Sequence, residues 1–349
     1  MIRQHLKRTA KYVLRAFMNI AVRWPYVSNI YYCLDRSFER EHCSVLAGRL
    51  TYYNGIKENS VDSHIHRLRR NIHRIEKGLI ACPRRSIFAV EYIEETVCSF
   101  ITVNDNVVAR VGNHRLSSQW SHDVLFRYFN VVLAGKNGSI DKARYEFYEH
   151  CKKYNVSDKG RVPDLRGSAV PPISVEQLEE LAIRRQSVRW YLERPVARST
   201  IDKAIEIAAL SPSACNRQPF EFRIFDNQDV VSRLASIPMG TSGFNHQFPV
   251  FVLIVGNLSA YPFERDRHII YIDGSLASMT FQLALEAQGV GSCSINWPDI
   301  STREREMAEE VGLNSDQRII MCLSLGYPDP DGLIPYSQKK TLDEIRSFN

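Results

Sequence analysis

The sequence predicts an α+β protein in which a basic, mainly helical N-terminal module precedes a domain with helices flanking a central mixed sheet. Residues 1–154 show helical patterns, whereas residues 175–349 alternate helical patterns with short apolar runs typical of strands. Between them, residues 155–174 combine Gly, Pro, Ser and charged residues without apolar periodicity. This composition is typical of a linker, so we expect two modules on either side of it.

The net charge of +6 is divided unevenly along the chain. Residues 1–172 contain 28 Lys and Arg against 16 Asp and Glu, a net charge of +12, and residues 173–349 contain 17 against 23, a net charge of −6. This asymmetry indicates that the two parts have different partners and that the first part faces something anionic.

In the first part we expect helices at residues 2–23, 62–80, 86–100, 116–134 and 141–154. Residues 2–23 contain six basic residues and no acidic one, with apolar residues at helical spacing. Such a segment could lie on an anionic membrane surface. No apolar run is long enough to span a bilayer and no secretory signal is visible, so we expect a cytoplasmic protein, peripheral on the inner face of the membrane if residues 2–23 bind it. Nucleic-acid binding is not expected, because the aromatic residues do not form a stacking platform.

The most distinctive stretch of this part runs from His64 to Leu79, where three His, four Arg and one Lys face only Glu76. It predicts either an anion site for a phosphate, nucleotide-sugar or lipid head group, or a helix whose charged face is solvated or pairs with the acidic second part. The three histidines lack metal-ligand spacing, and the eight cysteines form no CxxC pair, so we expect no metal site.

In the second part, helices are expected at residues 175–183, 201–210, 273–288 and 302–311, with Ser174 and Thr200 as N-caps. Strands are expected at 220–225, 249–256, 292–295 and 319–325. The apolar run at 249–256 (PVFVLIVG) indicates a strand buried on both faces.

Two motifs in this part suggest chemistry. RRQSVR, at 184–189, places three guanidinium groups and a hydroxyl where they could bind a phosphate, although a basic helix end is more often a solvated face. SPSACNRQPF, at 211–220, offers the Asn216 and Gln218 amides to the polar edge of a heterocycle, or is a plain connecting loop.

In this order the two motifs resemble the opening of the nitroreductase family, whose pattern is close to RRSxRxF followed by APSxxNxQPW. The similarity continues through the apolar run at 249–256, a helix beginning at Asp273-Gly274, and the stretches at 289–293, 325–328 and 337–342. It covers roughly half of the chain. Each motif alone indicates the family only weakly, whereas the same motifs in this order are fairly specific for it.

The resemblance implies a nitroreductase-like fold that binds FMN. The residues matching the family's FMN contacts are Arg185, Gln186, Ser187, Arg189, Asn216, Ser294, Asn296, Trp297, Ser337 and Lys339. Arg189 is expected near the flavin N1–O2 edge, where a cation stabilises the anionic reduced ring. Residues 294–297 match a stretch whose backbone N–H meets N5. Ser337 and Lys339 match phosphate contacts.

Three positions depart from the family pattern. Gln186 stands where Arg or His is common, and Ser337 stands where Lys is sometimes found. Asn296-Trp297-Pro298 replaces a stretch that commonly contains Gly, so Trp297 could line the pocket or pack in the core. These departures leave the substrate scope open.

The resemblance further implies a homodimer with FMN at the subunit interface. In the family reaction NAD(P)H reduces FMN, and the flavin then passes electrons to a second, small-molecule substrate. Flavin N5 carries the hydride, so no protein nucleophile or metal is required, and no catalytic side chain is assigned. The absence of a GxGxxG fingerprint agrees with a nicotinamide that stacks on the flavin.

The run HRIEKGL, at 73–79, resembles an extension that precedes nitroreductase domains in some bacterial surface-polysaccharide contexts. The main hypothesis is therefore an FMN-dependent NAD(P)H oxidoreductase, with a possible role in surface-polysaccharide metabolism. Two alternatives stay open: a flavin-dependent dehydrogenase of a peptide- or sugar-linked substrate, and a non-catalytic flavin-fold scaffold at a membrane-bound biosynthetic complex.

Overall fold

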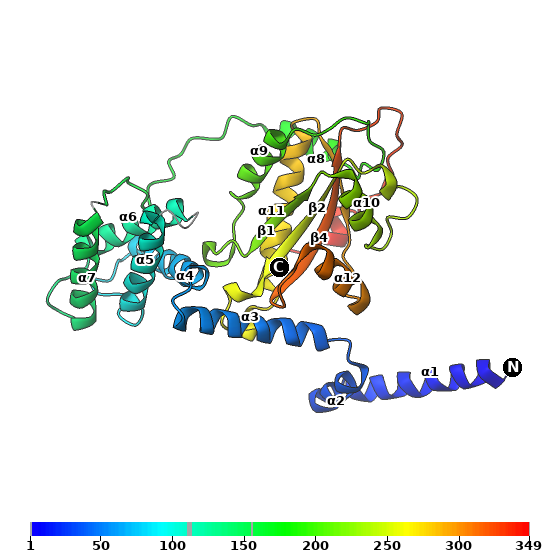
Figure 1. The fold of residues 1–349 in the computed structure, drawn as a ribbon, viewed down its shortest axis with the longest axis horizontal. Helices are drawn as coiled ribbons and strands as arrows, with labels where there is room; N and C mark the ends of the chain where they lie inside the picture. Colours follow the sequence, from blue (N-terminus) through cyan, green and yellow to red (C-terminus); the bar gives the residue numbers. More distant parts are fainter. Residues whose placement is uncertain (1, 110–113, 155, 349) are drawn as a thin grey trace.

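A computed structural model describes residues 2–109, 114–154 and 156–348 (Figure 1). The regular structure of the N-terminal part is helical: α1 (Ile2–Ala21), α2 (Pro25–Asp35), α3 (Glu39–Lys57), α4 (Val61–Ile80), α5 (Ile93–Val108), α6 (Arg115–Val131) and α7 (Gly138–Tyr154). Helices α4–α7 share a core in which Leu68, Phe100 and Phe147 are fully buried. α1 and α2 extend away from the rest of the molecule (Figure 1). Among the described helices, none combines the length and apolarity needed to cross a membrane.

The helix expected at residues 86–100 is wrong in its first half. Residues 81–92 form a loop, and α5 begins only at Ile93. Ala89 has a φ of +63°, a left-handed backbone conformation that interrupts a helix, and Pro83 supplies no backbone N–H. The Tyr128 hydroxyl donates to the Phe88 carbonyl at 2.7 Å and so ties this loop to α6.

The C-terminal part contains a four-stranded sheet in the order β1-β2-β4-β3. Its strands are β1 (Phe220–Phe225), β2 (Val250–Asn257), β3 (Gly291–Ile295) and β4 (Gln317–Gly326). The predicted α+β class and the flanking helices are confirmed. All four strands pair antiparallel, and the parallel component appears as an isolated bridge between Ser187 and Ser292 at the β3 edge.

Six helices accompany the sheet: α8 (Val175–Arg184), α9 (Arg198–Ala208), α10 (Gln228–Ser236), α11 (Ile269–Glu286), α12 (Ser301–Val311) and α13 (Leu342–Ile345). Side chains of β2 alternate between two cores, because successive residues of a strand point to opposite faces. Val252 packs in the core shared with α9 and α11, and Leu253 packs in the core shared with α10 and α12. The run at 249–256 is therefore buried on both faces, as the sequence predicted.

Helix boundaries follow the predicted capping in one case and depart from it in another. Ser174 caps α8, accepting from the Gln177 backbone N–H at 3.2 Å, while the Gln177 side chain accepts from the Ser174 N–H at 2.9 Å. α9 begins earlier than expected, so Thr200 lies inside the helix and Ala197 takes the N-cap position.

Helix α3 packs against the C-terminal part although it precedes the predicted linker. Gly48 lies so close to Leu258 that an added Cβ would stand 2.6 Å from the Leu258 Cβ. The Arg40 guanidinium pairs with the buried Glu304 carboxylate at 2.6 Å, and Arg318 donates to the Ser44 hydroxyl at 3.4 Å. The boundary between two modules at residues 155–174 stays a prediction. Helix α3 precedes this boundary and nevertheless packs against residues that follow it.

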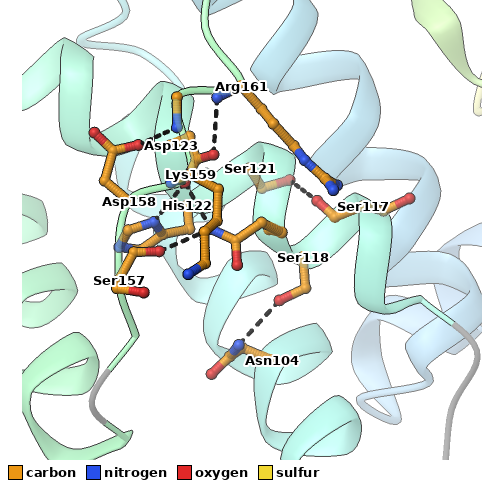
Figure 2. Close-up of polar contacts among 12 residues, drawn as sticks. Asn104, Ser117, Ser118, Ser121, His122, Asp123, Ser157, Asp158, Lys159 and Arg161 are labelled. Carbon is orange, nitrogen blue, oxygen red and sulfur yellow. Dashed lines mark hydrogen bonds and ion pairs between the residues drawn. The ribbon is translucent and has the colours of Figure 1, made fainter.

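A buried carboxylate holds the start of the 155–174 segment against α6 (Figure 2). Asp123 is fully buried and accepts from the backbone N–H of Arg161 at 2.9 Å and from the Gln119 amide at 2.7 Å. It also lies 2.9 Å from the His122 Nδ1. Burial favours the neutral acid, but the hydrogen bonds from His122 and the backbone outweigh it and lower the pKa of Asp123. We therefore assign this pair a structural role.

Candidate functional site

The first group of predicted site residues lies along the β3 edge of the sheet. After α8 ends at Arg184, Ser187 forms the parallel bridge to Ser292, and the Val188 N–H donates to the Ser292 carbonyl at 3.0 Å. This short pairing fixes residues 185–189 beside β3.

Cys293, a buried residue of β3, shows that three predicted residues converge there. Burial raises the pKa of its thiol, while the Arg189 charge, a hydrogen bond with Ser187 and the Arg185 charge act in the opposite direction. The Arg185 Nε is buried and has no hydrogen-bond partner among the residues that the structure describes. The Arg189 guanidinium makes a long hydrogen bond to the Ser187 carbonyl, 3.5 Å, and lies 5.5 Å from the centre of the Phe244 ring. This edge therefore has N–H donors available for an anionic or polar ligand.

A small cavity of about 220 Å³ adjoins this edge. Gln186 and Arg189 line it together with Gly332 and Ile334, which belong to the segment after β4. Ser337 and Lys339 follow that segment on an exposed tail, where Ser337 has a left-handed φ of +49°. Neither of these two predicted phosphate contacts is among the residues that line this cavity, and their role in FMN binding stays a prediction.

Ser294, Asn296 and Trp297 occupy the end of β3 and the residues after it. The Ser294 hydroxyl donates to the side-chain amide oxygen of Gln282 at 2.9 Å, and Asn296 is exposed. Trp297 is 9% exposed, packs in the core, and donates its indole N–H to the Glu304 carboxylate. Of the two roles open for Trp297, the structure shows core packing, so any contact with a bound ring would come from its backbone.

Asn216 lies in a second place, on a backbone with several left-handed residues. Cys215, Asn216 and Gln218 have φ values of +54°, +51° and +51°, which non-glycine residues rarely adopt. Such conformations cost about 1–3 kcal/mol each and persist where the surroundings fix them, often at functional sites.

The contacts that fix this loop come from distant elements. The Asp273 carboxylate accepts from the Ala214 N–H at 3.0 Å and from the Tyr261 hydroxyl at 3.2 Å. Arg69 of α4 donates from Nε to the Asn216 carbonyl at 2.6 Å. Arg217 is buried over the Tyr261 ring, at 4.6 Å from its centre, and within residues 2–109, 114–154 and 156–348 its Nε has no hydrogen-bond partner.

Burial shifts the pKa values of three ionisable groups around the 213–218 loop. It raises the pKa of Asp273, against the hydrogen bonds from Ala214 and Tyr261 and the Arg217 charge. It lowers the pKa of Arg69 to about 10. It also lowers the pKa of His66 to about 4, with help from the Arg217 charge, so His66 is neutral at pH 7.

The roles of Arg69 and Arg217 were missed by sequence reasoning. Arg217 stands inside the quoted motif but carried no signal that it would be buried. Arg69 approaches across 147 sequence positions, and no local pattern announces such a contact.

Within one chain the two places lie at opposite ends of the sheet. Ser292 pairs with Leu325, which pairs with Val250, whereas Phe220, four residues after Asn216, pairs with Gly256. Six residues of β2 separate these levels, which corresponds to about 20 Å at the usual strand rise. The predicted site residues of one chain therefore lie in two separate places, the candidate half-sites: residues 185–189 beside β3, and the 213–218 loop beside α4.

Comparison with protein families relates both of these places to known proteins. The nitroreductase family model matches residues 182–242 and 237–327, which include β1–β4 and both half-sites. The match to the nitroreductase family therefore lies in the C-terminal half of the chain, over residues 182–327.

Three similar proteins each match slightly less than or about half of this chain. A putative NADH dehydrogenase/NAD(P)H nitroreductase of Archaeoglobus fulgidus is 27% identical over 158 residues, covering 44% of this chain and 87% of the relative. Iodotyrosine deiodinase 1 of Rattus norvegicus is 21% identical over 196 residues, covering 49% and 68%. A solved putative NADH dehydrogenase/NAD(P)H nitroreductase of Parabacteroides distasonis is 24% identical, with a TM-score of 0.44, and covers 50% of this chain and 98% of its own.

Proposed function

We propose that this protein is an FMN-dependent oxidoreductase that takes hydride from NAD(P)H and passes electrons to a small-molecule acceptor. The observation that carries the proposal is the convergence of Arg185, Ser187 and Arg189 at the β3 edge of a nitroreductase domain, with donors available. FMN is an anion with a polar ring edge, and cationic and hydroxyl donors suit both parts.

The residues present fit FMN. Arg185 and Ser187 would hold its polar and phosphate groups, and Arg189 would place a positive charge where reduction adds negative charge. Asn216 would offer an amide from a loop whose backbone is fixed before any ligand arrives, which reduces the entropy lost on binding. When bound, FMN supplies the hydride chemistry, so no protein side chain has to act as a nucleophile.

The separation of the half-sites supports a homodimer in this proposal. Elements about 20 Å apart in one chain can hold one flavin if a second copy supplies one of them. Three apolar side chains on α11, Ile272, Leu276 and Met279, are 53%, 43% and 43% exposed and recur at i, i+4 and i+7. An apolar stripe of this kind on a long helix suits burial against a second copy.

The acceptor is proposed only as a small molecule. The relatives are named for different compounds, since one is called a nitroreductase and another an iodotyrosine deiodinase. Their names therefore do not indicate one particular acceptor. A link to surface-polysaccharide metabolism is part of the proposal because of the HRIEKGL stretch at 73–79.

Purified protein tests the proposal. We expect a yellow protein whose extracted cofactor is FMN and whose visible absorption is bleached by NADH or NADPH without oxygen. Bound FMN that neither nicotinamide reduces would favour a flavin-dependent dehydrogenase of a peptide- or sugar-linked substrate. A colourless protein that added FMN does not stabilise against heat would contradict the proposal and favour a scaffold.

A further inference from the structure

A second cavity, in the N-terminal part, has a lining that combines cations with apolar groups. It has a volume of about 670 Å³ and lies between the end of α4 and the loop at residues 81–92. Arg74, Lys77 and Arg85 contribute three positive charges, and Glu91 is the carboxylate among its lining residues. Most of the remaining wall is apolar: Ala81, Pro83, Ile87, Phe88, Ala89 and Val90.

The HRIEKGL stretch contributes Arg74, Lys77 and Gly78 to the lining of this cavity, and its other residues help to hold α4 in place. Glu76 accepts from the Trp120 indole at 2.9 Å and so anchors α4 to α6. Gly78 lets the Phe88 ring rest on the helix backbone, since an added Cβ would stand 2.3 Å from the Phe88 Cε2. Leu79 packs against the helical core. Arg74 and Lys77 are then left facing the cavity.

Arg74 is held in place without being neutralised. Its guanidinium lies 3.6 Å from the centre of the Tyr92 ring, and Nη1 donates to the side-chain amide oxygen of Asn71 at 3.4 Å. Asn71 is itself fixed, donating to Glu95 at 2.8 Å. The nearby Glu94 carboxylate pairs with Lys142 at 2.7 Å.

Throughout the described ranges, no ion pair involves Arg74, Lys77 or Arg85. Basic residues near a helix C-terminus often only balance the helix dipole. Here, by contrast, one of them is stacked and fixed, and all three share a cavity with an apolar wall. This arrangement points to a ligand.

We propose that this cavity binds an organic phosphate, a phosphate monoester or diphosphate whose attached group rests on the apolar wall. Three cations against one carboxylate leave two positive charges, which match a dianion, and a guanidinium binds phosphate oxygens in pairs. The volume exceeds that of a phosphate alone and falls in the range of sites for larger ligands. The phosphate can belong to a soluble nucleoside diphosphate or to a lipid head group, because both present the same charge.

Calorimetric titration of the full-length protein tests this proposal, with UDP, inorganic pyrophosphate and vesicles containing phosphatidic acid as separate probes. We expect saturable binding of UDP or of the vesicles, weakened roughly tenfold to a hundredfold by Arg74→Gln and by Arg85→Gln. Arg84→Gln is the matched control, because Arg84 is adjacent and exposed but does not line the cavity. The flavin content and thermal stability of each variant report whether its fold is intact.

The outcomes separate the sources and the failures. Binding of UDP assigns a soluble ligand, and binding of the vesicles alone, sensitive to Arg74→Gln, assigns a lipid head group. Pyrophosphate binding as tight as UDP binding would show that the apolar wall contributes nothing and would overturn the organic part. Equal losses from Arg84→Gln and Arg85→Gln would overturn the proposal itself. So would the absence of saturable binding of UDP and pyrophosphate together with vesicle binding that Arg74→Gln leaves unchanged, because residues 2–23 could account for such vesicle binding.

Discussion

Arg189 stands at the β3 edge with its guanidinium only weakly engaged by the protein. Its hydrogen bond to the Ser187 carbonyl is 3.5 Å long, and its other contact is with the face of Phe244. An arginine held this way keeps most of its five donors for a ligand. The Arg189 charge acts to lower the pKa of Cys293 and of Tyr191, against the effect of burial. Arg189 therefore lies close to both side chains, where residues 185–189 meet the sheet.

Replacing Arg189 by Ala is expected to weaken FMN binding by roughly tenfold to a hundredfold, because a charge-assisted hydrogen bond is lost. Fluorescence titration of apo-protein with FMN measures the change. Arg198→Ala is the control, since Arg198 pairs with Asp226 at 2.7 Å on the surface, away from β3. Unchanged flavin affinity in Arg189→Ala would remove this residue from the site.

At the scale of elements, α4 links the helical core to the Asn216 loop, and its histidines make this link sensitive to acid. The Nδ1 of His66 is buried and has no hydrogen-bond partner in the described part of the chain. It lies close to Arg217, Arg69, Asp62 and His114. Its pKa in the folded protein, about 4, lies below the ordinary value of 6.5. Its neutral form therefore stabilises the fold above pH 6.5, and this contribution is lost as the pH falls towards 4.

We expect His66→Gln to reduce the loss of unfolding free energy between pH 6.5 and pH 4, by about 1–3 kcal/mol. Urea denaturation at both pH values measures it. His246→Gln, at an exposed position, should keep the pH dependence of the unchanged protein. An identical slope in His66→Gln would show that His66 does not titrate with folding.

The elements themselves were largely predictable from local patterns. Ser174 predicted the start of α8, and the apolar run at 249–256 predicted β2. The helix expected at 86–100 failed because the backbone turn at Ala89 leaves no clear mark in the sequence. The RRQSVR and SPSACNRQPF motifs supplied the residues of both candidate half-sites, and their role in FMN binding stays a prediction. Their separation by about 20 Å depends on strand register, which long-range pairing decides and no single motif encodes.

At the scale of the whole molecule, α1 and α2 extend away from the folded parts (Figure 1) and expose large apolar side chains. Val13, Ile20 and Trp24 are 65%, 56% and 63% exposed. The same segment carries six basic residues and no acidic one at 2–23. We propose that it binds an anionic membrane surface, where each Lys or Arg contributes about 1 kcal/mol.

Deleting residues 1–23 should abolish co-sedimentation with phosphatidylserine vesicles while leaving flavin content unchanged. High salt should weaken the binding of the full chain, because screening reduces the attraction of basic side chains to the surface. Vesicles of neutral lipid serve as the control. Full-length protein that never sediments with anionic vesicles would contradict the proposal.

The most direct test of the central claim, that two chains build one flavin site, is the FMN content of co-expressed Arg189→Ala and Asn216→Ala subunits. Each variant alone should bind little FMN. If residues 185–189 of one chain and the Asn216 loop of the other form one site, a mixed dimer has one intact site and one doubly altered site. We therefore predict that FMN binding returns in the isolated mixed dimer. If each site belonged to one chain, both sites would carry a lesion, and mixed dimers without FMN would contradict the claim.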